Sequence, residues 1–264
     1  MYFWENHANC EVLDVKKFGH GIIRESVVRR RKQMRPYIVC HMAMSIDGKV
    51  TGDFLFTEQC AAANEEYYRI NRESHADAFA CGSVTMEESF TDGFQPNLSK
   101  YRKSFIPRED YVADKEATYY AVAFDRTGRL GWKESRIHDE DPGYDNAHII
   151  EVLCEKVSDE YLAYLRDIGV SYIFAGRVRM DVSLAVEKLY ELFGIEKLML
   201  EGGSIINGAF QREGLVDELS LVQVPMIAGN EGKPLFFDSR LSEYELDTVE
   251  QLSGGVNWLR YVRK

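Results

Sequence analysis

The sequence predicts an α/β fold: a mostly parallel sheet flanked by helices, within a single domain. Between residues 148 and 224, short apolar segments alternate with helical patterns, and such strand–helix–strand units build parallel sheets with right-handed crossovers. The apolar segments are continuous rather than alternating, which is typical of strands covered on both faces. A chain of 264 residues, 45% of them hydrophobic, is long enough for one such domain with elaborations.

The first part of the chain contains an extension, a strand and a helix. Residues 1–35 are interpreted as an N-terminal extension, followed by one domain over residues 36–264. The apolar segment 36–44 predicts a buried strand, which the turn residues Ser45 to Gly48 end. Thr57 is expected to cap a helix that runs to about residue 74, because threonine side chains accept hydrogen bonds from first-turn amides.

Two further strands are expected before the middle of the chain. Residues 76–81 form an apolar segment that Gly82 ends, and residues 118–124 form another. Between them, residues 91–116 are polar and contain Pro96 and Pro107, which indicates an excursion with the character of a loop or a lid.

The second half of the chain is more regular. Ser158 and Asp181 are expected at the starts of two helices, which Gly169 and Gly194 end. Near Val256 the composition indicates an edge strand or a hairpin in the tail 242–264. The remaining expected strands span residues 148–153, 170–174, 195–200 and 217–224, and a third helix spans residues 204–213.

Composition excludes several classes of protein. The 32 Lys and Arg residues against 43 Asp and Glu give a net charge of −11, which argues against binding nucleic acid or an anionic membrane. No apolar run reaches the roughly 18 residues of a spanning helix. Acidic residues stand near the start, where a signal peptide has basic residues. The five cysteines are scattered without a CxxC, so neither a disulfide scaffold nor a metal site is expected. We expect a cytoplasmic protein that acts on a small molecule.

Two glycine-containing turns follow predicted strands, at the edge where open parallel sheets bind ligands. Glu201–Ser204 joins a strand to a helix, and its paired glycines would allow phosphate to approach free helix amides. A plain strand-to-helix turn is the alternative. Gly82–Thr85 has the same character, although Ser83 or Thr85 could simply be an N-cap. Two such turns on one sheet indicate a dinucleotide, but neither is a GxGxxG or a P-loop.

The other two strand ends carry an acid and a base. Asp47 is either an ordinary turn aspartate or an acid directed into the ligand crevice, and Arg126 could either meet a phosphate or reach solvent. His41 lies within the first strand, where a hydrogen-bonded core histidine is the commoner interpretation. The sequence contains no zinc-deaminase signature and no GxSxG nucleophile motif.

Four segments resemble, in order and with compatible spacing, the riboflavin-biosynthesis pyrimidine reductase family. This family forms the reductase half of bifunctional deaminase–reductases. The resemblance covers residues 36 to about 240, and it implies a dihydrofolate-reductase-like fold, NADPH as the hydride donor and a homodimer. The segments are RPYIVCHMAMSIDGKV, HADAFACGSVTMEE, YAVAFD and EGGSIINGAFQREGLVDELSLVQVPMIAG.

The resemblance also implies roles for individual residues. Asp47 and Glu201 are expected near the reacting carbon, where one of them could relay a proton. His41, Ser45 and Arg72 are expected to face the substrate. The residues expected to contact the cofactor are Ala43, Gly82, Ser83, Thr85, Arg126, Gly202, Gly203, Ser204, Ile205, Ile206 and Asn207.

The implied activity is that of an NADPH-dependent oxidoreductase resembling 5-amino-6-(5-phosphoribosylamino)uracil reductase, with hydride transfer to a carbon next to nitrogen. The chain departs from the family in two places. His41 stands where the bifunctional enzymes have a lysine, and the stretch EESFTDGFQPN lacks the arginine that helps them hold the ribose phosphate. A dihydrofolate or pteridine reductase and a non-catalytic NADPH-binding module remain alternatives.

Overall fold

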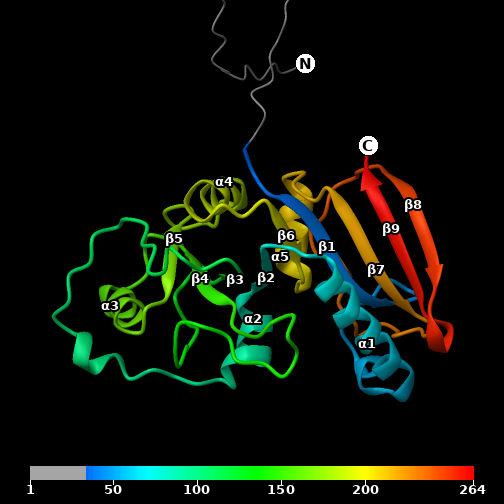
Figure 1. Cartoon of the computed structure of the whole chain (residues 1–264), viewed down its shortest axis with the longest axis horizontal. Helices are drawn as coiled ribbons and strands as arrows, with labels where there is room; N and C mark the ends of the chain where they lie inside the picture. Colours follow the sequence, from blue (N-terminus) through cyan, green and yellow to red (C-terminus); the bar gives the residue numbers. More distant parts are fainter. Residues whose placement is uncertain (1–33) are drawn as a thin grey trace, which may run out of the picture. The chain divides into compact units, whose positions relative to one another are not determined.

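A nine-stranded sheet organises residues 34–264, the part of the chain that the computed structural model describes (Figure 1). These residues form one compact unit. The strand order is β5-β4-β3-β2-β6-β1-β7-β9-β8; the first seven strands are parallel, and β9 is antiparallel to both neighbours. The mostly parallel sheet predicted from the sequence is therefore confirmed. The strands are β1 (Tyr37–Ser45), β2 (Ala78–Gly82), β3 (Tyr120–Phe124), β4 (His148–Leu153), β5 (Ser171–Phe174), β6 (Lys197–Leu200), β7 (Glu218–Val224), β8 (Tyr244–Gln251) and β9 (Asn257–Arg263).

The helices begin at the capping residues that the sequence predicts. Thr57, Ser158 and Asp181 each accept a hydrogen bond from a first-turn amide, and Gly194 ends its helix with a left-handed φ of 66°. The helices are α1 (Glu58–Glu73), α2 (Ser83–Met86), α3 (Asp159–Asp167), α4 (Val182–Phe193) and α5 (Ser204–Arg212). Shorter turns are η1 (Asp53–Phe56), the π-helical η2 (Glu87–Thr91), η3 (Leu98–Tyr101) and η4 (Ser253–Gly255).

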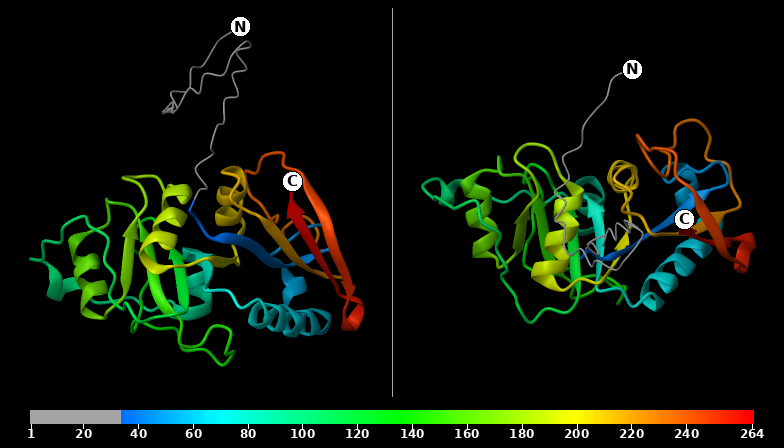
Figure 2. Two further views of the ribbon diagram at one scale, coloured as in Figure 1. Left: turned by 45° about the horizontal axis from the view of Figure 1, so that its top comes forward. Right: turned by 90° about the horizontal axis from the view of Figure 1, so that it is seen from above.

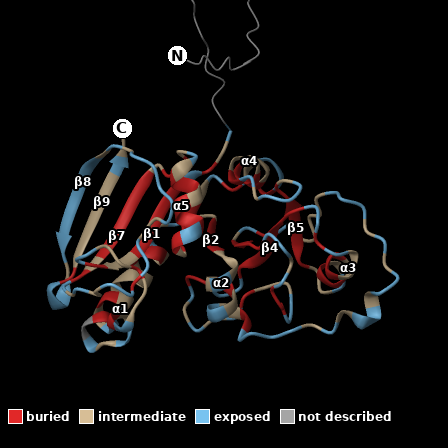
Figure 3. Ribbon diagram, turned by 180° about the vertical axis from the view of Figure 1, so that it is seen from behind, coloured by how far each residue is buried: buried red, intermediate tan, exposed pale blue. Residues whose placement is uncertain are grey.

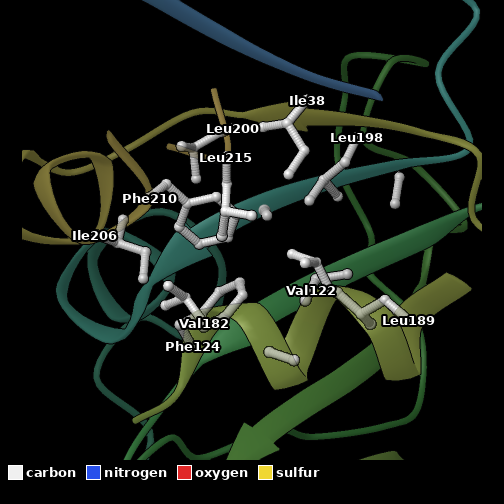
Figure 4. Close-up of a cluster of buried hydrophobic side chains, with 14 of the residues drawn as sticks. Ile38, Val122, Phe124, Val182, Leu189, Leu198, Leu200, Ile206, Phe210 and Leu215 are labelled. Atoms are coloured by element: carbon white, nitrogen blue, oxygen red, sulfur yellow. The ribbon is translucent and has the colours of Figure 1, made fainter. Parts of the chain in front are cut away.

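Helices cover both faces of the sheet (Figure 2). On one face, α4 and α5 pack against alternate strand residues, so that Leu189 and Phe210 share a core with Val122 and Leu200 (Figure 4). On the other face lie α1 and α3, the latter packing through residues such as Leu162. Strands buried on both faces explain why their sequences are continuously apolar.

The tail forms the hairpin that was one of its two predicted outcomes. The strands β8 and β9 extend the sheet beyond β7 as an antiparallel edge. Most of β8 is exposed, in contrast to the buried parallel strands (Figure 3).

The polar excursion between β2 and β3 packs beside β5 and α3. Tyr111 exchanges backbone hydrogen bonds with Tyr172 of β5, at 2.8 and 2.9 Å. Arg108 forms an ion pair with Asp159 at the start of α3, with 2.5 Å between Nη1 and Oδ1. These contacts hold the excursion at the β5 edge as a loop.

Residues 1–33, most of the predicted N-terminal extension, lie outside the described residues, and its boundary stays a prediction. Among residues 34–264, no helix is both long and apolar enough to cross a membrane. The same residues contain no group of three or more His, Cys, Asp or Glu side chains arranged to hold a metal ion.

Candidate active site

The two glycine-containing turns lie side by side at the carboxyl ends of the parallel strands, here called the carboxyl edge of the sheet. The last residue of β6, Leu200, pairs with Ala80 of β2 on one side and with Cys40 of β1 on the other. The amide of Gly82 donates a hydrogen bond of 2.7 Å to the carbonyl of Gly202, which joins the turns directly. Both turns therefore lie at carboxyl ends of strands of one sheet, as the sequence predicts, and the structure adds that the two strands are neighbours.

The N-terminus of α5 opens between these turns. Its cap residue, Gly203, provides no side-chain acceptor for the first-turn amides. The Ser204 hydroxyl donates to the carbonyl of Pro234 at 2.5 Å, and it accepts no hydrogen bond from these amides. A Cβ on Gly203 would lie 3.5 Å from the Thr85 hydroxyl oxygen, so this hydroxyl stands beside the helix end. Uncapped amides with a neighbouring hydroxyl are suited to a phosphate group.

Asn207 adds a polar atom without a partner. Its side chain is fully buried, and Nδ2 donates to the carbonyl of Leu235 at 3.3 Å. Its Oδ1 has no hydrogen-bond partner among the described residues. Because buried acceptors are normally satisfied, this atom is suited to a donor from a bound molecule. The predicted cofactor residues at the start of α5 thus fit a dinucleotide.

The remaining predicted cofactor residues differ in exposure. Ile205 is exposed, whereas Ile206 is buried, with its side chain 3.5 Å from the position of a Cβ on Gly82. Ser83 is half-buried at the start of α2, and Ala43 is half-buried within β1.

Arg126 follows β3 on the same edge of the sheet. Its side chain is exposed, and the guanidinium makes no hydrogen bond or ion pair with any residue from 34 to 264. The preceding Asp125 is buried and accepts backbone hydrogen bonds from Thr127 and Leu130, at 3.2 and 3.0 Å, so it fixes the turn. A rigid turn that carries a free guanidinium can bind an anion such as a phosphate.

A cavity of about 640 Å³ lies beside the same turns. Its wall combines aromatic rings with carboxylic acids, and Glu201 and Thr85 belong to it. The lining residues are Glu65, Tyr67, Tyr68, Cys81, Thr85, Ser89, Phe90, Asp139, Glu140, Asp141, Pro142, Tyr144 and Glu201.

Glu201 connects the cavity to the glycine turn. The residue is 7% exposed, Oε1 accepts a hydrogen bond from Asn71 Nδ2, and Oε2 accepts one from the Tyr144 hydroxyl at 2.8 Å. Burial raises the pKa of Glu201 from 4.5 to about 7, although the hydrogen bonds from Tyr144 and Asn71 oppose this shift. A carboxyl group with such a pKa can donate or accept a proton near neutral pH.

Asp47, the other predicted acid, does not line this cavity. Strand β1 continues five residues past the level of Leu200, from Cys40 to Ser45, which is about 16 Å along an extended strand. The exposed carboxylate of Asp47 accepts hydrogen bonds from the Ser45 hydroxyl at 2.6 Å and from the amides of Ala228 and Gly229 at 2.9 and 3.1 Å. Ser45 and Asp47 thus tie the end of β1 to the loop after β7.

His41 lies in the core and contacts the cavity wall from behind. It is fully buried, its ring stacks on that of Tyr67 with centroids 4.2 Å apart, and burial lowers its pKa to about 4. Nε2 lies 3.0 Å from the carbonyl of Tyr67, and Nδ1 lies 3.0 Å from the Ser220 hydroxyl, which accepts a hydrogen bond from Trp258. The imidazole is therefore neutral and oriented to support Tyr67.

Arg72 stands next to the cavity, and its guanidinium is already paired. It forms an ion pair with Asp141, a residue of the cavity wall. Asp141 also accepts a hydrogen bond of 2.7 Å from the amide of Gly143, so the ion pair belongs to an ordered loop.

Sequence reasoning missed most of the cavity wall. Tyr67 of the wall and Asn71, which donates to Glu201, are four residues apart on α1. This spacing puts them on one helix face and is a signal in the sequence that could have found them. Tyr144 and Asp139 to Pro142 come from the irregular segment between β3 and β4, in which no hydrophobic period marks a position.

Comparison with known proteins gives the family. The model of the RibD C-terminal domain matches residues 36–258. The chain is 30% identical over 196 residues to the 2,5-diamino-6-ribosylamino-4(3H)-pyrimidinone 5′-phosphate reductase of Methanothermobacter thermautotrophicus, covering 74% of this chain and 81% of that protein. The protein of the same name from Aquifex aeolicus is 30% identical over 205 residues, covering 76% and 81%.

Solved structures share the fold at lower identity. A pyrimidine reductase-like protein from Corynebacterium diphtheriae has a TM-score of 0.60 and 19% identity, over 87% of this chain and 92% of that one. RibD of Acinetobacter baumannii has a TM-score of 0.59 and 20% identity, over 87% and 58%. The predicted dihydrofolate-reductase-like fold is confirmed, and the chain belongs to the RibD C-terminal domain family, the reductases of riboflavin biosynthesis, and is an oxidoreductase.

Proposed function

We propose that this protein is an NADPH-dependent reductase that transfers hydride to a carbon next to nitrogen in an amino-substituted pyrimidine. The relatives' names, which specify a ribosylaminopyrimidinone as substrate, support this proposal. The observation that carries it is the position of Glu201. This acid belongs to the cavity wall and also begins the turn that leads to the N-terminus of α5, so substrate and cofactor would meet at one residue.

The cofactor would lie along the carboxyl edge of the sheet. Its pyrophosphate would accept hydrogen bonds from the first-turn amides of α5 and from Thr85, and Asn207 Oδ1 would accept one from the bound molecule. Arg126 would bind the 2′-phosphate that distinguishes NADPH from NADH. Ala43, Ser83 and Ile205 complete the proposed cofactor set through the family resemblance.

The chemistry requires a hydride and a proton. When bound, NADPH supplies the hydride. Glu201 in its protonated form would give a proton to the nitrogen next to the acceptor carbon, because its pKa of about 7 leaves a large protonated fraction at neutral pH. Tyr144 and Asn71 hold the carboxyl group in place, and the ring of Tyr67 would pack against the pyrimidine.

Four residues outside the cavity wall remain proposed site residues: His41, Ser45, Asp47 and Arg72. Asp47 would assist proton transfer only if the bound cofactor brings the reacting carbon toward the end of β1. His41 would act on the substrate through Tyr67, which it contacts directly. Arg72 would act through Asp141.

Loss of NADPH absorbance after addition of a substrate tests the proposal. We expect the protein to oxidise NADPH with 2,5-diamino-6-ribosylamino-4(3H)-pyrimidinone or its 5′-phosphate, and to form one reduced product for each NADPH consumed. Turnover with dihydrofolate alone would indicate a pteridine reductase. Binding of NADPH without turnover of either compound would indicate a binding module.

We propose further that the protein is a homodimer in the cytoplasm. The family resemblance supports the homodimer, and sedimentation equilibrium at micromolar concentration tests it. The four cysteines within residues 34–264 are buried and unpaired, which agrees with a reducing compartment.

A further inference from the structure

We infer that the substrate of this reductase is an amino-substituted planar heterocycle without a phosphate group. The inference rests on the proposed function, because it takes the cavity beside Glu201 to be the substrate site. It concerns the 5′-phosphate, which the relatives' names include in their substrate.

The charges of the cavity wall carry the inference. Five of the thirteen lining residues are carboxylic acids, and none is Lys, Arg or His. A phosphate with close to two negative charges would therefore meet several acids and no cationic side chain in this wall. Sites for phosphate normally provide arginine, lysine or free helix amides. The acids are Glu65, Asp139, Glu140, Asp141 and Glu201.

The arginines near the cavity cannot compensate for these acids. Arg72 is held by Asp141. Arg69 pairs with Glu66 and Glu73, at 2.8 and 2.6 Å between nitrogen and oxygen. Releasing either guanidinium toward a phosphate would leave its carboxylate partners without their counterion.

The free helix amides are also directed elsewhere. They belong to the N-terminus of α5, where the proposed cofactor pyrophosphate would lie, and residues 204–206 are not part of the cavity wall. Within residues 34–264, the wall of this cavity therefore offers a phosphate no cationic side chain and none of the first-turn amides of α5.

The same wall is well suited to an aminated ring. Tyr67, Tyr68, Phe90 and Tyr144 provide aromatic surface, with the rings of Tyr68 and Tyr144 edge to face at 6.0 Å. Carboxylates accept hydrogen bonds from amino groups and stabilise a protonated heterocycle. Exposed Glu65 and Glu140, which make no side-chain hydrogen bond or ion pair with residues 34–264, are free to do so.

A matched pair of compounds tests the inference. 2,5-Diamino-6-ribosylamino-4(3H)-pyrimidinone and its 5′-phosphate differ only in the phosphate. For each, kcat/KM with NADPH and the dissociation constant in the presence of NADP⁺ would be measured. We expect the compound without phosphate to have the higher kcat/KM and the lower dissociation constant.

A double variant tests whether the acids cause this preference. Glu65→Gln with Glu140→Gln removes two negative charges from the wall, and the ratio of the two kcat/KM values should shift toward the phosphorylated compound by about tenfold at low salt. This shift should shrink as salt screens exposed charges. The control, Glu191→Gln with Glu250→Gln, changes two exposed acids outside the cavity wall and should leave the ratio unchanged.

The outcomes separate this inference from the proposed function. Tighter binding or faster reduction of the phosphorylated compound by the wild-type protein would overturn the inference and leave the reductase proposal standing. An equal shift in the control variant would also overturn it. If NADPH binds but neither compound binds or reacts, the proposed pyrimidine substrate fails together with the inference.

Discussion

Glu201 is the residue on which the proposed chemistry depends most. Glu201→Gln keeps the shape and removes the transferable proton, so we expect kcat to fall about a hundredfold or more, the usual contribution of one acid–base group. Because the protonated form is required, the wild-type rate should decline as pH rises above about 7, and the variant should lack this decline. Steady-state rates from pH 5 to 9 check both; a variant with wild-type kcat would contradict the role.

The same carboxyl group links stability to pH. Its pKa is about 7 in the folded protein against 4.5 without burial, so between these values the folded state holds a proton that the unfolded state has lost. The wild-type free energy of unfolding should therefore fall, relative to that of Glu201→Gln, by up to roughly 3 kcal/mol as pH rises through this window. Urea unfolding of both proteins at pH 4.5 and 7 measures it, and equal pH dependence would argue against the raised pKa.

Asp47 is, with Glu201, one of the two acids that were predicted to relay a proton. Asp47→Asn should lower kcat about a hundredfold if the residue relays a proton. Its carboxylate, however, also accepts amide hydrogen bonds from the loop at Ala228 and Gly229. Stopped-flow rates with a parallel unfolding curve separate the two effects. Wild-type kcat with reduced stability would leave Asp47 as a loop-anchoring residue only.

Arg126 determines cofactor choice in the proposed arrangement. Arg126→Ala should weaken NADPH binding by roughly 1.5–3 kcal/mol, the range for a charge-assisted hydrogen bond, and leave NADH nearly unaffected. The loss should diminish as salt rises, because the guanidinium is exposed. Calorimetric titration with both dinucleotides checks the prediction, and Arg177→Ala after β5 is the matched variant. Equal losses for both cofactors would move the 2′-phosphate site elsewhere.

Among the helices, α5 has the clearest proposed role. Gly203 has φ −77°, which any residue adopts, and a Cβ there would meet only the Thr85 hydroxyl at 3.5 Å. Gly203→Ala should therefore fold and bind NADPH with little change. Gly203→Asp adds a negative charge at the pyrophosphate position and should cost at least about 2 kcal/mol of NADPH affinity, the upper range of helix-terminus charge effects. Isothermal titration of both variants with NADPH measures these affinities. An unchanged NADPH affinity in folded Gly203→Asp would exclude this helix end as the phosphate site.

The elements that local chemistry specifies were predictable. Apolar continuity identified the seven parallel strands, and Thr57, Ser158 and Asp181 marked helix starts, because strand burial and N-caps depend on neighbouring residues in the chain. The start of β2 was placed two residues early at 76. The strand starts where Ala78 pairs with residues of β3 and β6. These partners are distant in the chain, so the local sequence pattern does not show where the pairing begins.

Across the molecule, the edge of the sheet that carries the site could be predicted, and the cavity could not. Gly82 and Gly202 follow strands of one sheet, as expected, and their direct contact follows from the neighbouring positions of β2 and β6, which the sequence did not show. The separation of Asp47 from Glu201 depends on how far β1 runs past β6, which is a matter of register between segments 160 residues apart. The hydrogen bond from Tyr144 to Glu201 comes from an irregular loop. The position of Tyr144 therefore depends on long-range packing, and no hydrophobic periodicity in the sequence indicates it.

Transfer of deuterium from NADPH that carries deuterium at both C4 positions of the nicotinamide to the reduced product tests the central claim most directly. We expect one deuterium in the product, on the carbon next to nitrogen, for each NADPH oxidised by the wild-type protein. Glu201→Gln should bind labelled NADPH normally and form labelled product about a hundredfold more slowly. NADPH oxidation without deuterium in the reduced product, or binding of both molecules without any labelled product, would contradict the proposed hydride transfer.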